Sequence, residues 1–386
     1  MRQAFRSDIL SLPSHPINEI ARIAWAQGGV TPLFFGEGDL VTPAFIREAA
    51  KRALDDGKTF YAPTTGIPEL REAIAAYSSR VHGRAIDVRR ITVPGSAMLS
   101  IVLALECTVR TGDNVVVVSP VWPSTTLAAL ALGAQVRYAP LARDKDGGWC
   151  FDLGRVTDAC DARTRAIFIC TPCNPTGWVM TREEQRELLE FSRARSIALI
   201  SDEVYSRLIY DAPCAPSFLE IAEADDPVIV INGFSKAFAM TGWRIGWMTA
   251  PEFLEAPLRA LSTVNNPGAT VFAQYGALAA LTDPRGEAFI VAQRERCRRG
   301  KALIERIARR SNRIRPFRID GSFYAYLEID GITDSFALAE RLVREAKVGV
   351  APGVAFGPGN EAFIRLCFAL DENTLEAAME RLIAAL

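Results

Sequence analysis

The sequence predicts an α/β protein with a large domain, built on a doubly wound and mostly parallel seven-stranded sheet, and a smaller α+β domain. Two observations predict this fold. Short apolar runs recur along the middle of the chain, with amphipathic stretches of helical spacing between them. After about residue 275 the pattern changes to long Arg-rich helical stretches followed by short strand-like runs, which indicates a separate domain.

The seven predicted strands are mostly runs of aliphatic residues, as expected for strands that are buried on both faces. In chain order they cover residues 91–93, 115–118, 135–138, 166–170, 198–201, 228–231 and 245–248. Ligands bind outside the carboxyl ends of the strands in sheets of this kind, so the loops at those ends are where a site is expected.

Helix signals lie between and around these strands. Thr181 and Glu184 form a capping box ahead of a helix. Pro68 opens another helix that runs to about Val81, Pro43 stands at the first position of a third, and Asp371 caps a C-terminal helix. We place residues 46–274 in the large domain and residues 1–45 with 275–386 in the small one, so that a cleft forms between them.

Composition narrows the class of ligand. The 386 residues include 44 Lys plus Arg against 45 Asp plus Glu, a balance that favours neither nucleic acid nor an anionic membrane as partner. No apolar stretch approaches the ~18 residues needed to span a bilayer, and residues 1–10 lack the apolar core of a signal peptide. We therefore expect a cytoplasmic protein that acts on small molecules.

The cysteines and histidines offer little for metal chemistry. Eight cysteines are scattered along the chain and are expected to be buried free thiols. Cys170 and Cys173 have the C-x-x-C spacing of a redox pair or of half a metal site, but no second pair exists. With His15 and His82 the only histidines, we expect no metal.

The segment 233–247 is the most informative part of the chain. It places Lys236 directly after the predicted strand 228–231, at the carboxyl end where a cofactor carbonyl would be met. Ser235 and Arg244 could clamp a phosphate beside it. The alternative is a surface lysine on a solvated turn.

Polar residues also follow four other strands. Ser96 and Ala97 begin a helix whose first amides could bind phosphate, and the alternative is an ordinary helix cap. Trp122 could stack on a heteroaromatic ring or pack in the core. Asn174 lies in a tight turn and could donate to a phenolic or carbonyl oxygen.

The last pair of candidates is Asp202 and Tyr205, an acid at a buried strand end and a tyrosine just beyond it. The alternatives are a helix N-cap for Asp202 and a core position for Tyr205. Each alternative is reasonable alone, but five such clusters in strand order together outline one site.

These motifs resemble those of the class I aminotransferases, which are fold-type I pyridoxal 5′-phosphate (PLP) enzymes, over nearly the whole chain. The matching landmarks are G-E-G-D at 36–39, residues 61–70, N-P-T-G at 174–177, S-D-E-V-Y at 201–205, residues 234–246, P-G at 352–353, F-G at 356–357 and I-R-L at 364–366.

The resemblance implies a role for each candidate. Lys236 resembles the lysine that holds PLP as an aldimine and shuttles a proton between the substrate Cα and the cofactor C4′. Asp202 resembles the carboxylate that keeps the pyridinium nitrogen protonated. The remaining implied contacts are Asn174 and Tyr205 to the ring oxygen, Trp122 on the ring face, Ser96, the Ala97 backbone, Ser235 and Arg244 to the phosphate, Tyr61 to the phosphate from the other subunit, and Gly36, Asn174 and Arg365 to the substrate.

The implied function is transfer of an amino group from an L-amino acid to a 2-oxo acid by a ping-pong mechanism in a homodimer. The alternative is a C–S β-lyase or another eliminating, cyclising or oxidising PLP enzyme, since one fold and one residue set run several chemistries. A PLP-sensing regulator would need a DNA-binding module, and a dehydrogenase would need G-x-G-x-x-G after the first strand. Gly38, Ala97 and Cys173 differ from the residues that many members of that family have at these positions, and they leave the identity of the substrate open.

A pocket for an acidic side chain would also need a second cation. Its candidates are Arg22, Arg207 and the arginines near residue 313, all of which are expected at the surface.

Overall fold

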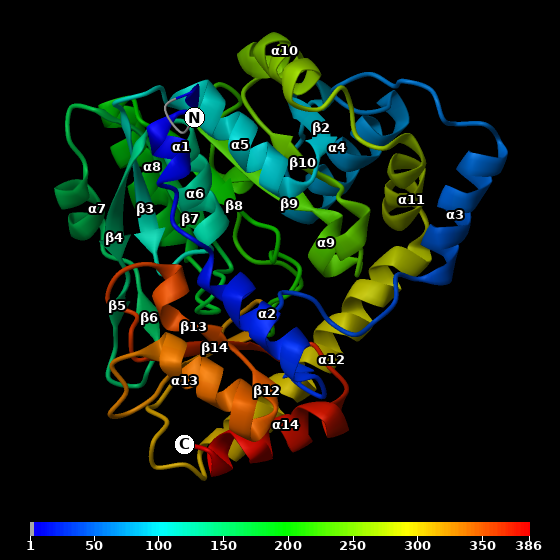
Figure 1. Ribbon diagram of the computed structural model, residues 1–386. Helices are drawn as coiled ribbons and strands as arrows, with labels where there is room; N and C mark the ends of the chain where they lie inside the picture. The colour runs from blue at the N-terminus through cyan, green and yellow to red at the C-terminus, as the bar shows by residue number, and fades with distance from the viewer. Residues whose placement is uncertain (1–3) are drawn as a thin grey trace.

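The computed structural model describes residues 4–386 and confirms the α/β fold, with all seven predicted strands in one sheet (Figure 1). The strand order is β2 (Ile91–Gly95), β10 (Gly246–Thr249), β9 (Val228–Gly233), β8 (Ala198–Asp202), β7 (Thr164–Cys170), β3 (Asn114–Ser119) and β4 (Gln135–Pro140). Strand β10 runs antiparallel to both of its neighbours, and the other pairs are parallel. The carboxyl ends of the parallel strands therefore share one edge.

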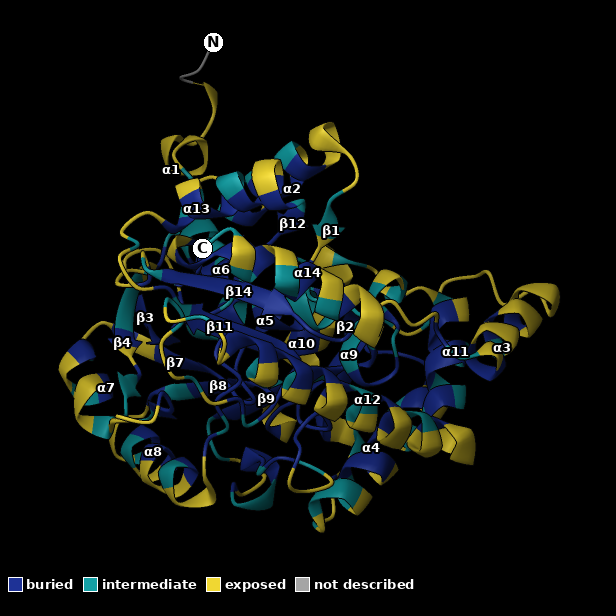
Figure 2. Cartoon of the chain, turned by 90° about the horizontal axis from the view of Figure 1, so that it is seen from below, coloured by how far each residue is buried: buried dark blue, intermediate teal, exposed yellow. Residues whose placement is uncertain are grey.

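Helices cover both faces of this sheet. Alternate residues of one strand point to opposite faces, so Val115 and Val117 pack in one apolar cluster with Ile101 of α5, whereas Val116 packs in another with Leu188 of α8. The helices around the large sheet are α3 (Ala44–Asp55), α4 (Pro68–His82), α5 (Ala97–Thr108), α6 (Pro123–Ala131), α7 (Leu153–Ala159), α8 (Arg182–Arg195), α9 (Phe234–Ala237), α10 (Glu255–Asn265) and α11 (Val271–Thr282). In Figure 2 the central strands of the sheet are buried and the outer faces of α3 and α7 are exposed.

The C-terminal part is α+β, as expected. Its three-stranded antiparallel sheet has the order β11 (Tyr324–Glu328), β14 (Phe363–Cys367) and β13 (Ala351–Pro352). The helices are α12 (Pro284–Ala308), which runs from the large sheet into this part (Figure 1), α13 (Ser335–Arg341) and α14 (Glu372–Ala384), and a small separate hairpin pairs β5 (Ala142–Arg143) with β6 (Trp149–Cys150).

The N-terminal segment packs on the C-terminal part. Strand β1 (Thr31–Pro32) pairs in parallel with β12 (Val348–Gly349), and α2 (Pro16–Gln27) buries Ile17 and Ile20 there. A single turn of helix, α1 (Ser7–Leu10), precedes it with no buried residue. Residues 16–40 thus approach the cavity from the side of the C-terminal part.

The helix signals are largely confirmed. The Thr181 and Glu184 side chains form the reciprocal capping box, α4 begins at Pro68, and Asp371 accepts from the first amides of α14. Helix α3 differs by one residue, since Pro43 has extended backbone torsions and is the N-cap rather than the first helical residue. Within residues 4–386, no helix is long and apolar enough to cross a membrane.

Candidate active site

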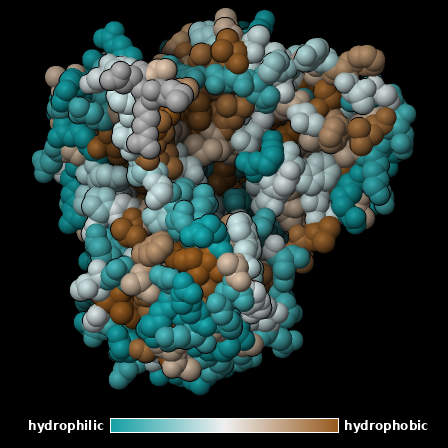
Figure 3. Space-filling model, viewed as in Figure 1, coloured by the Kyte–Doolittle hydropathy of each residue, from teal (hydrophilic) through white to brown (hydrophobic). Residues whose placement is uncertain are grey.

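A cavity of about 510 Å³ lies at the carboxyl edge of the large sheet. It is lined by nine of the predicted site residues, namely Gly36, Ala97, Trp122, Asn174, Asp202, Tyr205, Ser235, Lys236 and Arg244. The face of the molecule drawn in Figure 3 is hollowed near its centre, with apolar residues inside the hollow. Ser96, Tyr61 and Arg365 are the predicted residues that do not line the cavity.

The strand ends bring these side chains together. Asp202 is the last residue of β8, and β9 ends at Gly233 and leads directly into the short helix that carries Lys236. Strand β2 ends at Gly95, and α5 starts at Ala97. Because β8 and β9 are parallel neighbours and α5 contacts β8, β9 and β2, the three loops open onto one space.

Lys236 is the group with the clearest chemistry. Its Nζ donates a hydrogen bond of 2.6 Å to the Gly36 carbonyl oxygen. Although part of the side chain is accessible through the cleft, protein surrounds the amino group, and this burial lowers its pKa from 10.5 to about 8. The lysine of a solvated turn would keep its ordinary pKa, so that alternative is wrong.

Asp202 is a buried carboxylate without a cationic partner in direct contact. Its Oδ1 accepts a hydrogen bond of 3.3 Å from the Val204 amide, and no helix begins there, so it is not a helix N-cap. Burial raises its pKa to about 6, against the lowering effects of the Val204 amide and of Lys236. The Val204 amide and Lys236 therefore compensate the charged form only in part, and a further cation in direct contact would stabilise it.

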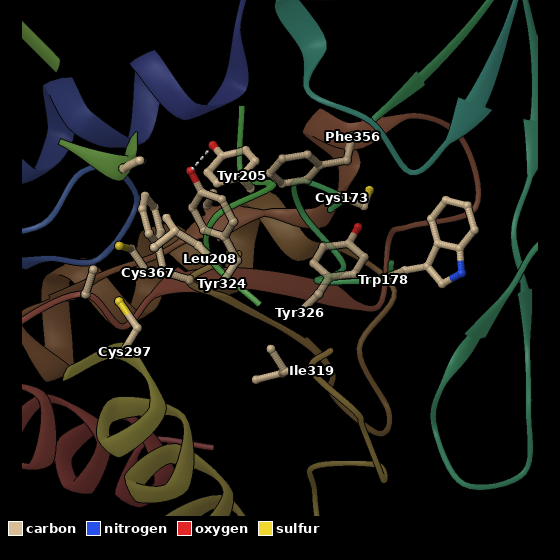
Figure 4. Packing of buried hydrophobic residues seen from close by; sticks show 14 of the residues in the cluster. Cys173, Trp178, Tyr205, Leu208, Cys297, Ile319, Tyr324, Tyr326, Phe356 and Cys367 are labelled. Atoms are coloured by element: carbon tan, nitrogen blue, oxygen red, sulfur yellow. Dashed lines mark hydrogen bonds between the residues drawn. The ribbon is translucent and has the colours of Figure 1, made fainter. Parts of the chain in front are cut away.

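Tyr205 and Tyr324 meet through their hydroxyl oxygens, which are 2.8 Å apart (Figure 4). Tyr324 belongs to β11, so the pair joins the large sheet to the C-terminal part. Burial raises the pKa of Tyr205 well above its usual value. A side chain at Gly36 would collide with the Tyr324 hydroxyl, which explains the glycine at that position.

Arg365 is fully buried in β14, the middle strand of its sheet, so the alternative of a strand-edge surface cation is wrong. Its Nη1 donates to Asn174 Oδ1 at 2.9 Å, and its Nη2 donates to the Phe34 carbonyl oxygen. The guanidinium lies 4.4 Å from the centre of the Tyr324 ring and behind the cavity wall, and its Nε has no partner among the described residues.

The other two residues outside the cavity have visible local roles. Ser96 Oγ accepts a hydrogen bond of 3.2 Å from the Leu99 amide and so caps α5, the alternative given for it above. Tyr61 is 95% exposed and lines a second surface cavity together with residues 266–272. Its predicted contact with a phosphate from another subunit stays a prediction.

Several residues of the cavity wall are not among the predicted site residues. They are Phe35, Glu37, Met98, Ile101, Ser124, Val204, Thr241 and Tyr324. Tyr324 was the most accessible to prediction, because it stands in an expected strand of alternating tyrosines. Phe35 and Glu37 flank Gly36 and reach the cavity only because the N-terminal segment folds back over it.

The donor set fits PLP. Lys236 offers a primary amine of lowered pKa to an aldehyde, and the partly compensated Asp202 carboxylate suits a protonated ring nitrogen. The N-terminus of α5, Ser235 and the Arg244 guanidinium line the same cavity and suit a phosphate.

Comparisons with known proteins agree with this chemistry. Residues 31–382 match the family described as aminotransferase class I and II. The chain is 36% identical to a probable aspartate/prephenate aminotransferase of Aquifex aeolicus, covering 100% of this chain and 99% of that protein. It is 32% identical to aromatic-amino-acid aminotransferase 2 of Thermococcus litoralis, covering 92% of each.

Solved structures give the same assignment. A mutant of Thermus thermophilus aspartate aminotransferase superposes with a TM-score of 0.91 at 31% identity, covering 99% of each chain. An aromatic aminotransferase from Pyrococcus horikoshii superposes with a TM-score of 0.87 at 32% identity, covering 95% of this chain and 98% of that one. With the lysine, the carboxylate and the phosphate-binding elements in one cavity, the chain belongs to the class I and II aminotransferase family and is a PLP-dependent enzyme.

Proposed function

We propose that the protein transfers the amino group of an L-amino acid to a 2-oxo acid in two half-reactions, and that Lys236 is the base that moves the substrate proton. The observation that carries the proposal is the Lys236 amino group, held by the Gly36 carbonyl oxygen inside the cavity with its pKa lowered to about 8. An amine of that pKa exchanges protons readily near neutral pH.

PLP supplies an electron-accepting ring that stabilises negative charge on the substrate Cα. We assign Asp202 to hold a proton on the ring nitrogen, since its carboxylate is buried and has no cation in direct contact. Asn174 and Tyr205 are assigned to the ring oxygen, and Trp122 packs against the ring. These four side chains line the cavity around Lys236.

The phosphate is assigned to Ser96, the Ala97 amide, Ser235 and Arg244, at the N-terminus of α5. The substrate carboxylate is assigned to Arg365 and Asn174, with Gly36 beside them. The contact between Arg365 and Asn174 supports this role, because it holds the guanidinium in place before a carboxylate arrives.

The proposed enzyme is a cytoplasmic homodimer in which Tyr61 of the partner subunit completes the phosphate site. Exposed apolar side chains near Tyr61 support the dimer, with Phe60 83% exposed and Val264 82% exposed.

We also propose the division into a large domain, 46–274, and a small one, 1–45 with 275–386. The pairing of β1 with β12 supports it.

Transamination predicts a single turnover when one substrate is withheld. With an amino donor alone, each PLP-loaded subunit should release one equivalent of 2-oxo acid and lose the visible absorbance of bound PLP, and a 2-oxo acid should then restore it. Absorbance and product are measured together for L-aspartate, L-phenylalanine and L-leucine. Continuous release of pyruvate and ammonia from L-cysteine, whose Cβ carries a thiol as leaving group, would instead identify a lyase.

The lowered pKa of Lys236 predicts how PLP uptake depends on pH. Only the neutral amine attacks the aldehyde, so uptake by the cofactor-free protein should rise about tenfold per pH unit and level off above pH 8. Borohydride trapping at timed intervals measures the rate. For Nα-acetyl-lysine as control, the rate of aldehyde capture should level off only near the ordinary lysine pKa of 10.5. A rate for the protein that levels off only at so high a pH would contradict the assignment.

A further inference from the structure

We propose that the enzyme prefers amino donors with aromatic or large aliphatic side chains to aspartate and glutamate. The proposal rests on the transamination proposed above and adds the class of substrate to it. It comes from the composition of the cavity wall and from the position of the charged groups around it.

The part of the wall beside the substrate clamp is aromatic. The Phe34 carbonyl oxygen contacts Arg365, and the next residue, Phe35, lines the cavity together with Trp122 and Tyr324. Phe35 is fixed in place, since its ring packs edge-on against Phe34 with the centroids 4.5 Å apart. A side chain that extends from a carboxylate held at Arg365 therefore meets apolar rings.

The cations of the cavity are already assigned. Among the described residues that line it, Lys236 and Arg244 are the two with positive charge, and the proposed function assigns them to the aldehyde and the phosphate of PLP. The other charged lining residues, Glu37 and Asp202, are acids. A second carboxylate on the donor would be desolvated without a partner and would approach Glu37, which is unfavourable on both counts.

Arg207, Arg22 and Arg313, three of the arginines that the sequence offers as candidates, do not supply the missing cation. Arg207, which was expected at the surface, is buried, but it donates to the Tyr77 hydroxyl at 2.7 Å and pairs with Glu287. Arg22 is exposed and pairs with Glu19. Arg313 donates to the backbone oxygens of Asp330 and Leu386.

His15 is a further titratable group near the wall, with its ring centroid 5.4 Å from that of Trp122. Burial, followed by the charge of Arg365, lowers its pKa, so it is neutral at physiological pH. It therefore adds no charge that would attract a second carboxylate.

A second copy of the chain would also add apolar groups. The edge that carries Tyr61 consists of residues 59–66 and 264–272, and neither segment contains a charged residue. Its exposed side chains include Phe60 and Val264. The adjacent Lys58 lies over the Tyr275 ring of its own chain, 5.8 Å from the centroid.

The test compares donors on the PLP-loaded enzyme. The second-order rate constant of the half-reaction should be about 100-fold higher for L-phenylalanine than for L-aspartate, the range that an apolar pocket can discriminate. Binding of the unreactive acids 3-phenylpropanoate and succinate, measured by calorimetry, should follow the same order. Equal or faster reaction of aspartate overturns the inference, whereas no reaction with any amino acid overturns the proposed function instead.

A variant of Phe35 tests the wall itself. Phe35→Ala should lower the ratio of rate constants for L-phenylalanine over L-alanine by about tenfold, because it removes contacts that only the larger donor makes. The matched control is Phe253→Ala, since Phe253 is 64% exposed and does not line the cavity. A ratio that is unchanged in Phe35→Ala overturns the assignment of this wall to the donor's side chain.

Discussion

Lys236→Ala should reduce transamination by about 10⁴-fold, because it removes both the amine that captures PLP and the base that moves the substrate proton. Among the described residues that line the cavity, Lys236 is the one lysine, so no neighbouring amine takes its place. The measurements are kcat with a saturating donor and the mass of the borohydride-treated protein. The variant should carry no covalently trapped PLP.

The matched control is Lys145→Ala, which removes an exposed lysine outside the cavity and should leave both measurements unchanged. The Lys236 side chain has one hydrogen bond, to a backbone oxygen, so Lys236→Ala should remain folded by circular dichroism. Trapping of PLP on another lysine, or activity within tenfold of the wild type, would contradict the assignment of Lys236.

The large sheet was predictable because most of its strands are short apolar runs buried on both faces. The reversed direction of β10 was not, since Gly246–Thr249 has the same apolar character as a parallel strand. Lys236 and Asp202 were predictable for a related reason. Asp202 ends one such run and Lys236 lies just after another, and the fold places the ends of both strands on one edge of the sheet.

The environment of Arg365 was harder to predict. It is central in its sheet only because the two-residue strand Ala351–Pro352 pairs on its outer side, and so short a strand leaves no periodic signal. Phe35 and Tyr324 were missed as cavity residues because they come from the N-terminal segment and β11. Tertiary packing brings those segments to the cavity, and local sequence does not report it.

Asp202→Asn should reduce transamination by about 10³-fold, the scale seen when a preorganised electrostatic partner is lost. An amide cannot hold a proton on the ring nitrogen as a carboxylate does, so the ring becomes a weaker acceptor of electrons. PLP should still be trapped on Lys236, although its affinity should fall. The measurements are kcat, the dissociation constant of PLP and exchange of the substrate Cα proton.

Although Asp202→Asn lowers activity, it should raise the free energy of unfolding of the cofactor-free protein. The pKa of Asp202 is raised from 3.8 to about 6 in the folded state, so folding favours the protonated form, and stability is lost as pH rises through 6. At pH 8 the cofactor-free variant should therefore be more stable than the wild type, by about 3 kcal/mol. Excess PLP should reverse that order, since it binds the wild type more tightly.

Glu203→Gln separates this reversal from a general effect of burial. Glu203 is adjacent and fully buried, and burial raises its pKa to about 7, but it bonds to the Ser201 hydroxyl and the Phe218 amide rather than facing the cavity. This variant should keep wild-type turnover and PLP affinity whatever its stability. If Asp202→Asn and Glu203→Gln behaved alike in the presence of PLP, the carboxylate of Asp202 would have no special relation to the cofactor.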